Sequence, residues 1–193
     1  MAISANSNGR SVRDLVIIAM LTALAVIVSF VVDIPILAAA PYLTYDPSNV
    51  IVMTGSFAYG PGAGCIIAFV SCLIHGSSSG VWGVVMNSIL SVSVAASSGL
   101  LFKHLKTRYK LIVSLLLSAV IFVIFAVLMN LIITPIYTGM SIEDIAAMII
   151  PVFLPFNLIK AAINVAITLP LYKAVERFML PALYKKKAAA NND

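Results

Sequence analysis

Long apolar stretches separated by short polar segments dominate the pattern of this chain. A membrane-spanning helix needs about 20 mostly apolar residues. The candidates are residues 15–32, 48–59, 62–73, 81–102, 111–134 and 155–172, the last continuing towards Arg177. The second and third are short, and "YGPGAG" between them is typical of a tight turn, so they form a predicted helical hairpin. The pattern therefore predicts an all-α integral membrane protein, a bundle of six transmembrane helices.

The first stretch resembles a signal peptide in one respect, because Arg10 and Arg13 precede it and "AAAP" at residues 38–41 follows it. The run over residues 15–32 is long enough to span a bilayer, however. We therefore interpret it as a retained first helix.

Composition supports a membrane protein, since 62% of the 193 residues are hydrophobic and 10% are charged. The length suits one domain over residues 1–193, with a helical core at about 12–178 and a short basic tail at 179–193. Cys65 and Cys72 lie on one apolar stretch at a spacing too long for a disulfide, so we interpret both as packing residues.

The charges predict the orientation. Eleven of the 12 lysines and arginines precede the first helix, fill the loop between the fourth and fifth, or follow the sixth. With six spans these three places share one face, and basic loops stay in the cytoplasm. Both termini are therefore expected in the cytoplasm. The positive net charge is explained by topology and contact with anionic lipid, and we expect no nucleic-acid partner.

Three loops lie on the opposite face. Loop 1 (residues 33–47) contains Asp33 and Asp46, and the second is "HGSSSG" at residues 75–80. The third, residues 135–153, contains "SIED", where Ser141 resembles a helix N-cap with an acid three residues later. A short amphipathic helix over residues 142–150 is expected there.

Lys160 is the one basic residue that breaks the orientation rule. It lies about 7–8 Å below the start of the sixth helix, where a charge costs about 2.5–3.5 kcal/mol and the helix dipole adds a further penalty. Asn157 and Asn164 share its helix face by their spacing.

Asn130 on the fifth helix and Asn87 on the fourth are expected at a similar depth. Four amides and one ammonium would then surround a polar, flat or ring-shaped solute. Two alternatives stay open. The asparagines can simply bond across helices, and Lys160 can reach the surface or pair with Asp46.

No residue pattern indicates catalysis, a metal site or a cofactor. The "GSSSG" segment matches G-x-S-x-G only formally, because it lies in a loop between helices rather than at a strand–helix turn. A phosphate-binding loop is absent, and so is an acid within the spans that could relay protons. A binding bundle of this kind needs a partner that supplies energy. Ala19 and Ala23 form a small-xxx-small pair that suits either a partner helix or internal packing.

Four stretches resemble the substrate-binding S components of energy-coupling factor (ECF) vitamin transporters, and most closely the riboflavin-binding members. They are "PYLTYDPSNV", "YGPGAG", "LMNLIITPIY" and "LPFNLIK", within a resemblance that covers roughly residues 12–178.

The resemblance implies a multi-pass protein of the bacterial cell membrane that holds a vitamin near the outer face, under loop 1. Asn157, Lys160 and Asn130 would meet the isoalloxazine ring, and Thr44 and Tyr45 would line the same site. It also implies a transmembrane scaffold and two cytoplasmic ATPases as partners. Ala19 and Ala23 on the first helix would then be the docking surface.

The sequence departs from the riboflavin-binding pattern in two places. Loop 1 contains Asp46-Pro47-Ser48-Asn49 where those relatives have D-F-S-D, and Ala161 stands where a glycine is usual. Asn164 is an additional polar residue. Pantothenate, pyridoxine or folate therefore remain alternative ligands, and a structural or assembly protein remains the alternative of another class.

Overall fold

A computed structural model describes residues 12–37, 43–75 and 80–178. The helices are α1 (Val12–Val31), α2 (Ser48–Tyr59), α3 (Pro61–His75), α4 (Gly80–His104), α5 (Lys110–Thr138), α6 (Ile142–Met148) and α7 (Leu154–Phe178). A π-helical turn, Ile149–Phe153, joins α6 to α7. Two short strands, β1 (Ile34–Pro35) and β2 (Thr44–Tyr45), pair antiparallel in loop 1, with Ile34 opposite Tyr45.

The six predicted spans are confirmed as helices, and the bounds of α2 agree with the prediction. In the described part of the chain, α1, α4, α5 and the continuous segment from α6 through α7 are long and apolar enough to cross a membrane. The shorter α2 and α3 form the predicted hairpin, and Gly60 turns the chain between them with a φ of 88° that favours glycine. The predicted short helix is α6, and the Ser141 hydroxyl caps it by accepting from the Asp144 N–H at 3.1 Å.

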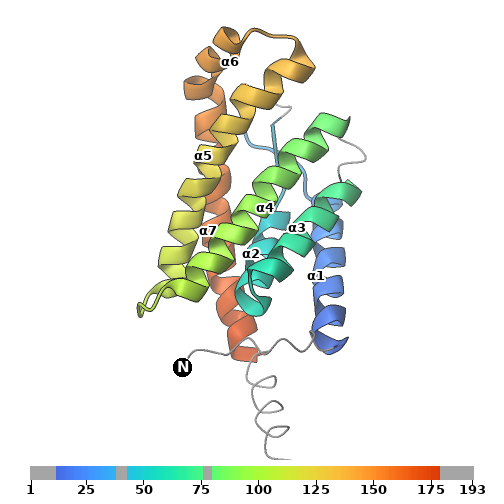
Figure 1. Ribbon diagram of the computed structural model, residues 1–193, viewed down its shortest axis with the longest axis vertical. Helices are drawn as coiled ribbons and strands as arrows, with labels where there is room; N and C mark the ends of the chain where they lie inside the picture. Colours follow the sequence, from blue (N-terminus) through green and yellow to red (C-terminus); the bar gives the residue numbers. More distant parts are fainter. Residues whose placement is uncertain (1–11, 38–42, 76–79, 179–193) are drawn as a thin grey trace, which may run out of the picture.

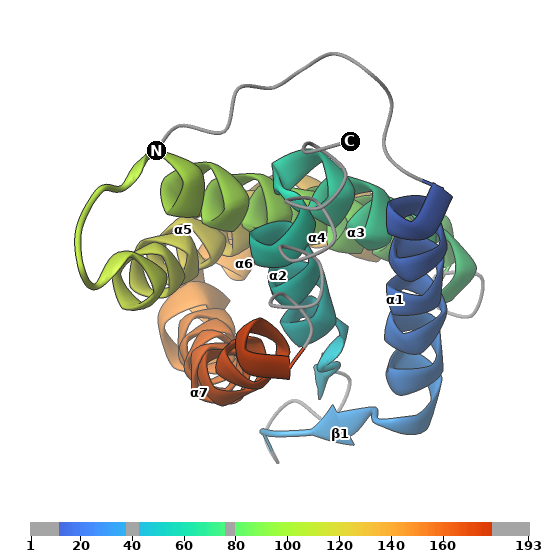
Figure 2. The same ribbon diagram turned by 90° about the horizontal axis from the view of Figure 1, so that it is seen from below.

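The bundle is organised around α2, which packs against α1, α3, α4 and α7 (Figure 2). Every residue of α2 from Ser48 to Phe57 is buried. One core, with Ile51 and Val52, joins α2 to α1, α3 and α4. The other, with Met53 and Phe57, joins α2 to α4, α5 and α7. A helix too short to span the membrane therefore forms the centre of the protein.

Close packing of α2, α3 and α4 depends on small residues. The Ser56 hydroxyl donates to the Ala95 carbonyl at 2.6 Å, and Gly64 and Gly99 face Ser56 so closely that a methyl group at either would collide with it. The two cysteines are free and partly buried, and the Cys65 thiol lies 3.9 Å from the Val92 carbonyl.

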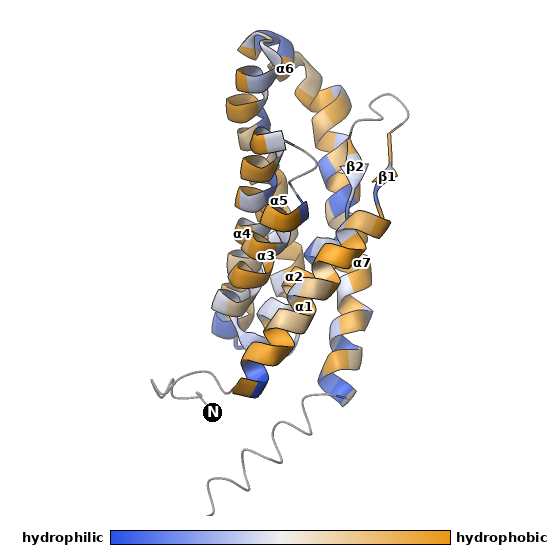
Figure 3. Cartoon of the chain, turned by 90° about the vertical axis from the view of Figure 1, so that its right-hand side faces the viewer, coloured by the Kyte–Doolittle hydropathy of each residue, from blue (hydrophilic) through white to orange (hydrophobic). Residues whose placement is uncertain are grey.

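The two ends of the bundle differ in charge. The start of α1, the α4–α5 connection and the end of α7 lie at one end, here called the basic end (Figure 1). Its described cations include Arg13, Lys106, Arg108 and Arg177. α6, with Glu143 and Asp144, lies at the opposite, acidic end. Figure 3 shows hydrophobic residues over most of the helical surface and hydrophilic ones at both ends of the bundle and near β1 and β2.

This arrangement agrees with the predicted grouping of cations, and the cytoplasmic side remains a prediction. Arg10, the basic tail at 179–193, "AAAP" and most of the serine–glycine loop lie outside the described residues.

Asp46 fixes loop 1 to the bundle. Its carboxylate accepts hydrogen bonds from the Ser48 backbone N–H and hydroxyl, each at 2.8 Å. It also accepts from the Ser29 hydroxyl, 3.0 Å from both carboxylate oxygens, at the end of α1. One side chain therefore joins the last turn of α1 to the first turn of α2, and it satisfies a helix-start N–H that would otherwise lack a partner.

We predict that Asp46→Ala lowers the free energy of unfolding by about 1–2 kcal/mol, because three donors lose a charged acceptor. Thermal unfolding in detergent measures the loss. The control is Asp33→Ala, since Asp33 is an exposed carboxylate of the same loop. Equal midpoints for the two variants and the wild type would contradict this role for Asp46.

Candidate functional site

The inward face of α7 carries two buried asparagines. Asn157 and Asn164 are 4% and 5% exposed, although the first half of α7 is apolar apart from them and Lys160. Ala161 lies between them on the same face and belongs to the core shared with α5. The Asn157 amide donates to the Phe153 carbonyl at 2.7 Å, one turn earlier on the chain.

Asn130 faces the same core from α5. It is 4% exposed and one turn beyond Ala126, a core residue. Its amide donates to the Ala126 carbonyl at 2.7 Å, and its oxygen accepts from the Thr134 hydroxyl at 3.2 Å. Because α5 packs directly on α7, three buried amides, Asn130, Asn157 and Asn164, face one interior. They are called the amide set below.

Loop 1 reaches the amide set through Tyr45. The buried Tyr45 hydroxyl donates to the Asn164 Oδ1 at 3.0 Å. Burial, with the neighbouring Asp46 carboxylate, raises the pKa of Tyr45 to about 12, so the phenol keeps its proton at neutral pH. Thr44 lies beside it and is partly buried. Both predicted loop residues are therefore near the amide set, and Tyr45 contacts one member.

Lys160 is partly buried on α7, and its ammonium lies 5.9 Å from the centroid of the Phe156 ring. Within the described residues it reaches no carboxylate at ion-pair distance, and the charge of Asp46 acts on it from further away. The Asp46 oxygens are instead occupied by Ser29 and Ser48. The alternative in which Lys160 pairs directly with Asp46 therefore finds no support in this geometry.

Asn87 differs from the other predicted site residues because its side chain is exposed on α4. Its spacing places it on the helix face of Leu90 and Val94, which are core residues. It shows no contact with the amide set, and its role in binding remains a prediction.

The buried Asn49 was not among the predicted site residues. It is 4% exposed near the start of α2, and its Oδ1 has no hydrogen-bond partner among the described residues. In the sequence it had no periodic signal, because it lies in the first turn of a helix that is buried on every side and therefore has no single inward face. Its burial on all sides follows from the central place of α2.

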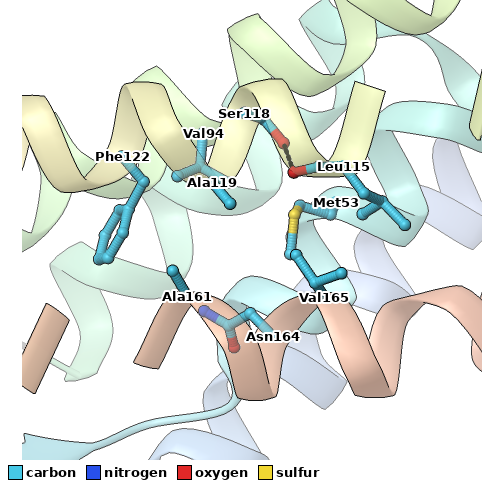
Figure 4. Close-up of a pocket in the computed structure, with 9 residues that line it drawn as sticks. All are labelled: Met53, Val94, Leu115, Ser118, Ala119, Phe122, Ala161, Asn164 and Val165. Carbon is cyan, nitrogen blue, oxygen red and sulfur yellow. Dashed lines mark hydrogen bonds between the residues drawn. The ribbon is translucent and has the colours of Figure 1, made fainter. Parts of the chain in front are cut away.

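A small cavity lies between α5 and α7, beside one member of the amide set. Figure 4 shows Ala161 and Asn164 of α7 on one side and Ala119 and Phe122 of α5 on the other. Its volume of about 10 Å³ is enough for one water molecule. Asn164 is the one amide that lines it, and the other lining residues described are apolar except Ser118.

Aromatic rings close the interior towards the basic end. The rings of Phe57, Phe102 and Tyr172 lie with centroids 5.0–5.5 Å apart and join α2, α4 and α7. The Lys110 ammonium lies 4.3 Å from the Phe102 centroid. The three buried carboxamides therefore lie on the acidic-end side of this ring cluster. Such an arrangement suits binding from the acidic end.

A second feature lies on the outside of the bundle. A groove of about 620 Å³ runs between α1 and α3. Ala19 and Ala23 line it together with larger apolar residues, among them Leu15, Ile66 and Val70. Both alanines are exposed, so their side chains are open to another helix and do not serve internal packing.

Comparisons with known proteins agree with this architecture. The family described as "ECF transporter, substrate-specific component" matches residues 13–172. The riboflavin transporter RibU of Staphylococcus aureus (strain TCH60) is 29% identical over 176 residues, covering 86% of this chain and 92% of that protein. The riboflavin transporter FmnP of Bacillus subtilis (strain 168) is 30% identical over 164 residues, covering 79% and 86%.

A solved structure of the S component of a bacterial ECF transporter has the same fold, with a TM-score of 0.73 and 26% sequence identity. The match covers 86% of this chain and 97% of that one. The apolar spans and the relatives place the chain in the bacterial cytoplasmic membrane as a multi-pass protein. Because the family match covers most of the described bundle, this chain belongs to the substrate-specific (S) components of ECF transporters.

Proposed function

We propose that this S component binds riboflavin for uptake, at the amide set near the acidic end. The observation that carries the proposal is the set itself, three buried carboxamides, with Lys160 on the helix that carries two of them, in a chain otherwise built for a bilayer. The names of the two relatives support riboflavin as the ligand. Asn130, Asn157 and Lys160 are also the positions that the riboflavin-binding resemblance singled out.

The chemistry of the groups suits a flavin. A carboxamide both donates and accepts, and an ammonium only donates, so together they match a ring edge that alternates carbonyl oxygens with N–H groups. Asn130 and Asn157 now bond to carbonyls of their own helices. These bonds hold the side chains in place, and their remaining donors and acceptors are available to a ligand. Thr44 and Tyr45 close the edge of the site in loop 1.

The acidic end is then the outer face, and the protein captures its ligand from outside. Energy comes from partner subunits, a transmembrane scaffold and two cytoplasmic ATPases. The S component itself is not an enzyme and carries riboflavin as cargo, without a resident cofactor. The groove at Ala19 and Ala23 is the proposed contact with the scaffold.

For ligand binding, we predict that Lys160→Ala weakens riboflavin binding by about 1–3 kcal/mol, because buried polar groups of the ligand lose a partner. The quenching of riboflavin fluorescence on titration with purified protein measures the dissociation constant. Lys173→Ala is the control, since Lys173 is an exposed lysine near the far end of the same helix. An unchanged dissociation constant for Lys160→Ala would remove Lys160 from the site.

The same titration separates the proposed function from its alternatives. If the wild type fails to quench riboflavin but pantothenate, pyridoxine or folate raises its unfolding temperature, the ligand is that vitamin. If no vitamin stabilises it, the amides serve only to join helices and the protein is a structural or assembly factor.

For docking, we predict that Ala19→Leu with Ala23→Leu reduces co-purification with the scaffold severalfold, because larger side chains keep a second helix from approaching closely. Riboflavin binding by the isolated protein is expected to stay unchanged. The control is Ala162→Leu with Ala166→Leu, an exposed pair with the same spacing on α7. Equal co-purification by both double variants would argue against the groove as the docking surface.

A further inference from the structure

Asn49 is a buried polar side chain that nothing in the fold explains. It is 4% exposed, and its Oδ1 has no partner. An unmet acceptor in the interior is unfavourable, so such groups in native proteins call for a specific cause. Ser88, Ser114 and Thr168 also have unpartnered buried oxygens. Asn49 is the only carboxamide among these described residues.

The helical register shows which way Asn49 faces. It precedes Met53 by four residues and Phe57 by eight, so the three side chains lie on one face of α2. Met53 lines the small cavity together with Asn164 and Ala161 of α7. Met53 and Phe57 belong to the core that joins α2 to α5 and α7. Asn49 therefore faces the same interior one turn nearer the acidic end, which is where the amide set lies.

The first turn of α2 holds Asn49 rigidly. Asp46 accepts from the backbone and hydroxyl of the adjacent Ser48, and the same carboxylate is attached to Ser29 of α1. The helix around it is buried on all sides. Because the acceptor is already fixed and desolvated, little additional conformational entropy is lost when it binds a donor.

Asn49 also supplies a free hydrogen-bond acceptor, which Asn130, Asn164 and Lys160 do not. The Asn130 and Asn164 oxygens already accept from Thr134 and Tyr45, respectively. Lys160 can only donate. The Asn49 oxygen is thus a fully buried carboxamide acceptor with no hydrogen-bond partner among the described residues, and it is ready for an N–H or O–H of a bound solute. The Asn157 amide, which is described only as a donor, leaves a second carboxamide oxygen on the same interior.

We propose that Asn49 is a further ligand-contacting residue that determines specificity, with its Oδ1 accepting a hydrogen bond from an N–H or O–H of the bound vitamin. This inference rests on the proposed function, since it assigns a residue to the same site. A vitamin or analogue without a donor at this position is then discriminated against, because the oxygen stays buried and unpaired.

The test is a riboflavin titration by fluorescence quenching with the wild type, Asn49→Leu and Asn49→Asp. Leucine keeps the approximate size and removes the acceptor, so we expect affinity to fall about tenfold or more. Aspartate keeps acceptor oxygens at the same place and is expected to lose less affinity than leucine. Ser114→Ala is the matched control, because it also removes a buried unpartnered oxygen, but near the basic end of α5.

The unfolding temperature of each ligand-free variant separates binding from packing. A purely structural Asn49 predicts a changed unfolding temperature with an unchanged dissociation constant, and that result overturns the proposal. Equal losses for leucine and aspartate also overturn it. If Asn49→Leu does not fold, Asn49→Ala takes its place, because alanine also removes the acceptor oxygen. A wild-type dissociation constant for riboflavin in Asn49→Ala then overturns the proposal.

Lumiflavin, which lacks the ribityl chain, locates the donor. If Asn49→Leu also binds lumiflavin more weakly than the wild type does, the donor is on the ring. If the two proteins bind lumiflavin equally well, the donor is a ribityl hydroxyl. Both results support the contact. Wild-type protein that binds neither flavin contradicts the proposed function and the inference together, whereas normal binding by both wild type and Asn49→Leu overturns the inference alone.

Discussion

A polar group inside a bilayer must find a partner within the protein or in a ligand, and this constraint organises the whole molecule. Asn130 and Asn157 meet it within their own helices, and Asn164 meets it through Tyr45 of loop 1. Among the described residues, the Asn49 oxygen has no hydrogen-bond partner and Lys160 has no carboxylate at ion-pair distance. These two groups are therefore polar groups whose needs the described fold does not meet.

The remaining architecture holds that interior in shape. The short helix α2 is buried on all sides and separates two apolar cores, so its first turn is fixed where loop 1 begins. Asp46 attaches this turn to α1, and Tyr45 attaches the loop to α7. Hydrogen bonds of Asp46 and Tyr45 thus link α1, which carries Ala19 and Ala23 of the groove, through loop 1 to the amide set on α7. Aromatic rings seal the interior on the side of the ATPase partners that we propose.

Much of this was predictable from the sequence, because membrane spans follow from apolar length and the grouping of cations from loop charges. Three site residues could be found because each breaks an apolar run, namely Lys160, Asn157 and Asn130. Ser141 could be found because its spacing to Asp144 is typical of a helix N-cap. Asn49 stood out only as part of the departure from the family's loop 1 pattern and not as a site residue, because burial on every side of a 12-residue helix depends on which neighbours surround it. The exposure of Asn87, on the same helix face as the core residues Leu90 and Val94, likewise depends on which neighbours cover that part of α4, and spacing alone does not determine this. The bond between Tyr45 and Asn164 joins positions 119 residues apart and has no local signal.

The most direct test of the central claim is the identity of the small molecule that the purified protein carries from cells supplied with riboflavin. The protein is denatured, and the released compound is examined by mass and absorption spectrum. The account predicts riboflavin in an amount close to one molecule per chain. A different vitamin, or no vitamin at all from protein that remains folded before release, would contradict it.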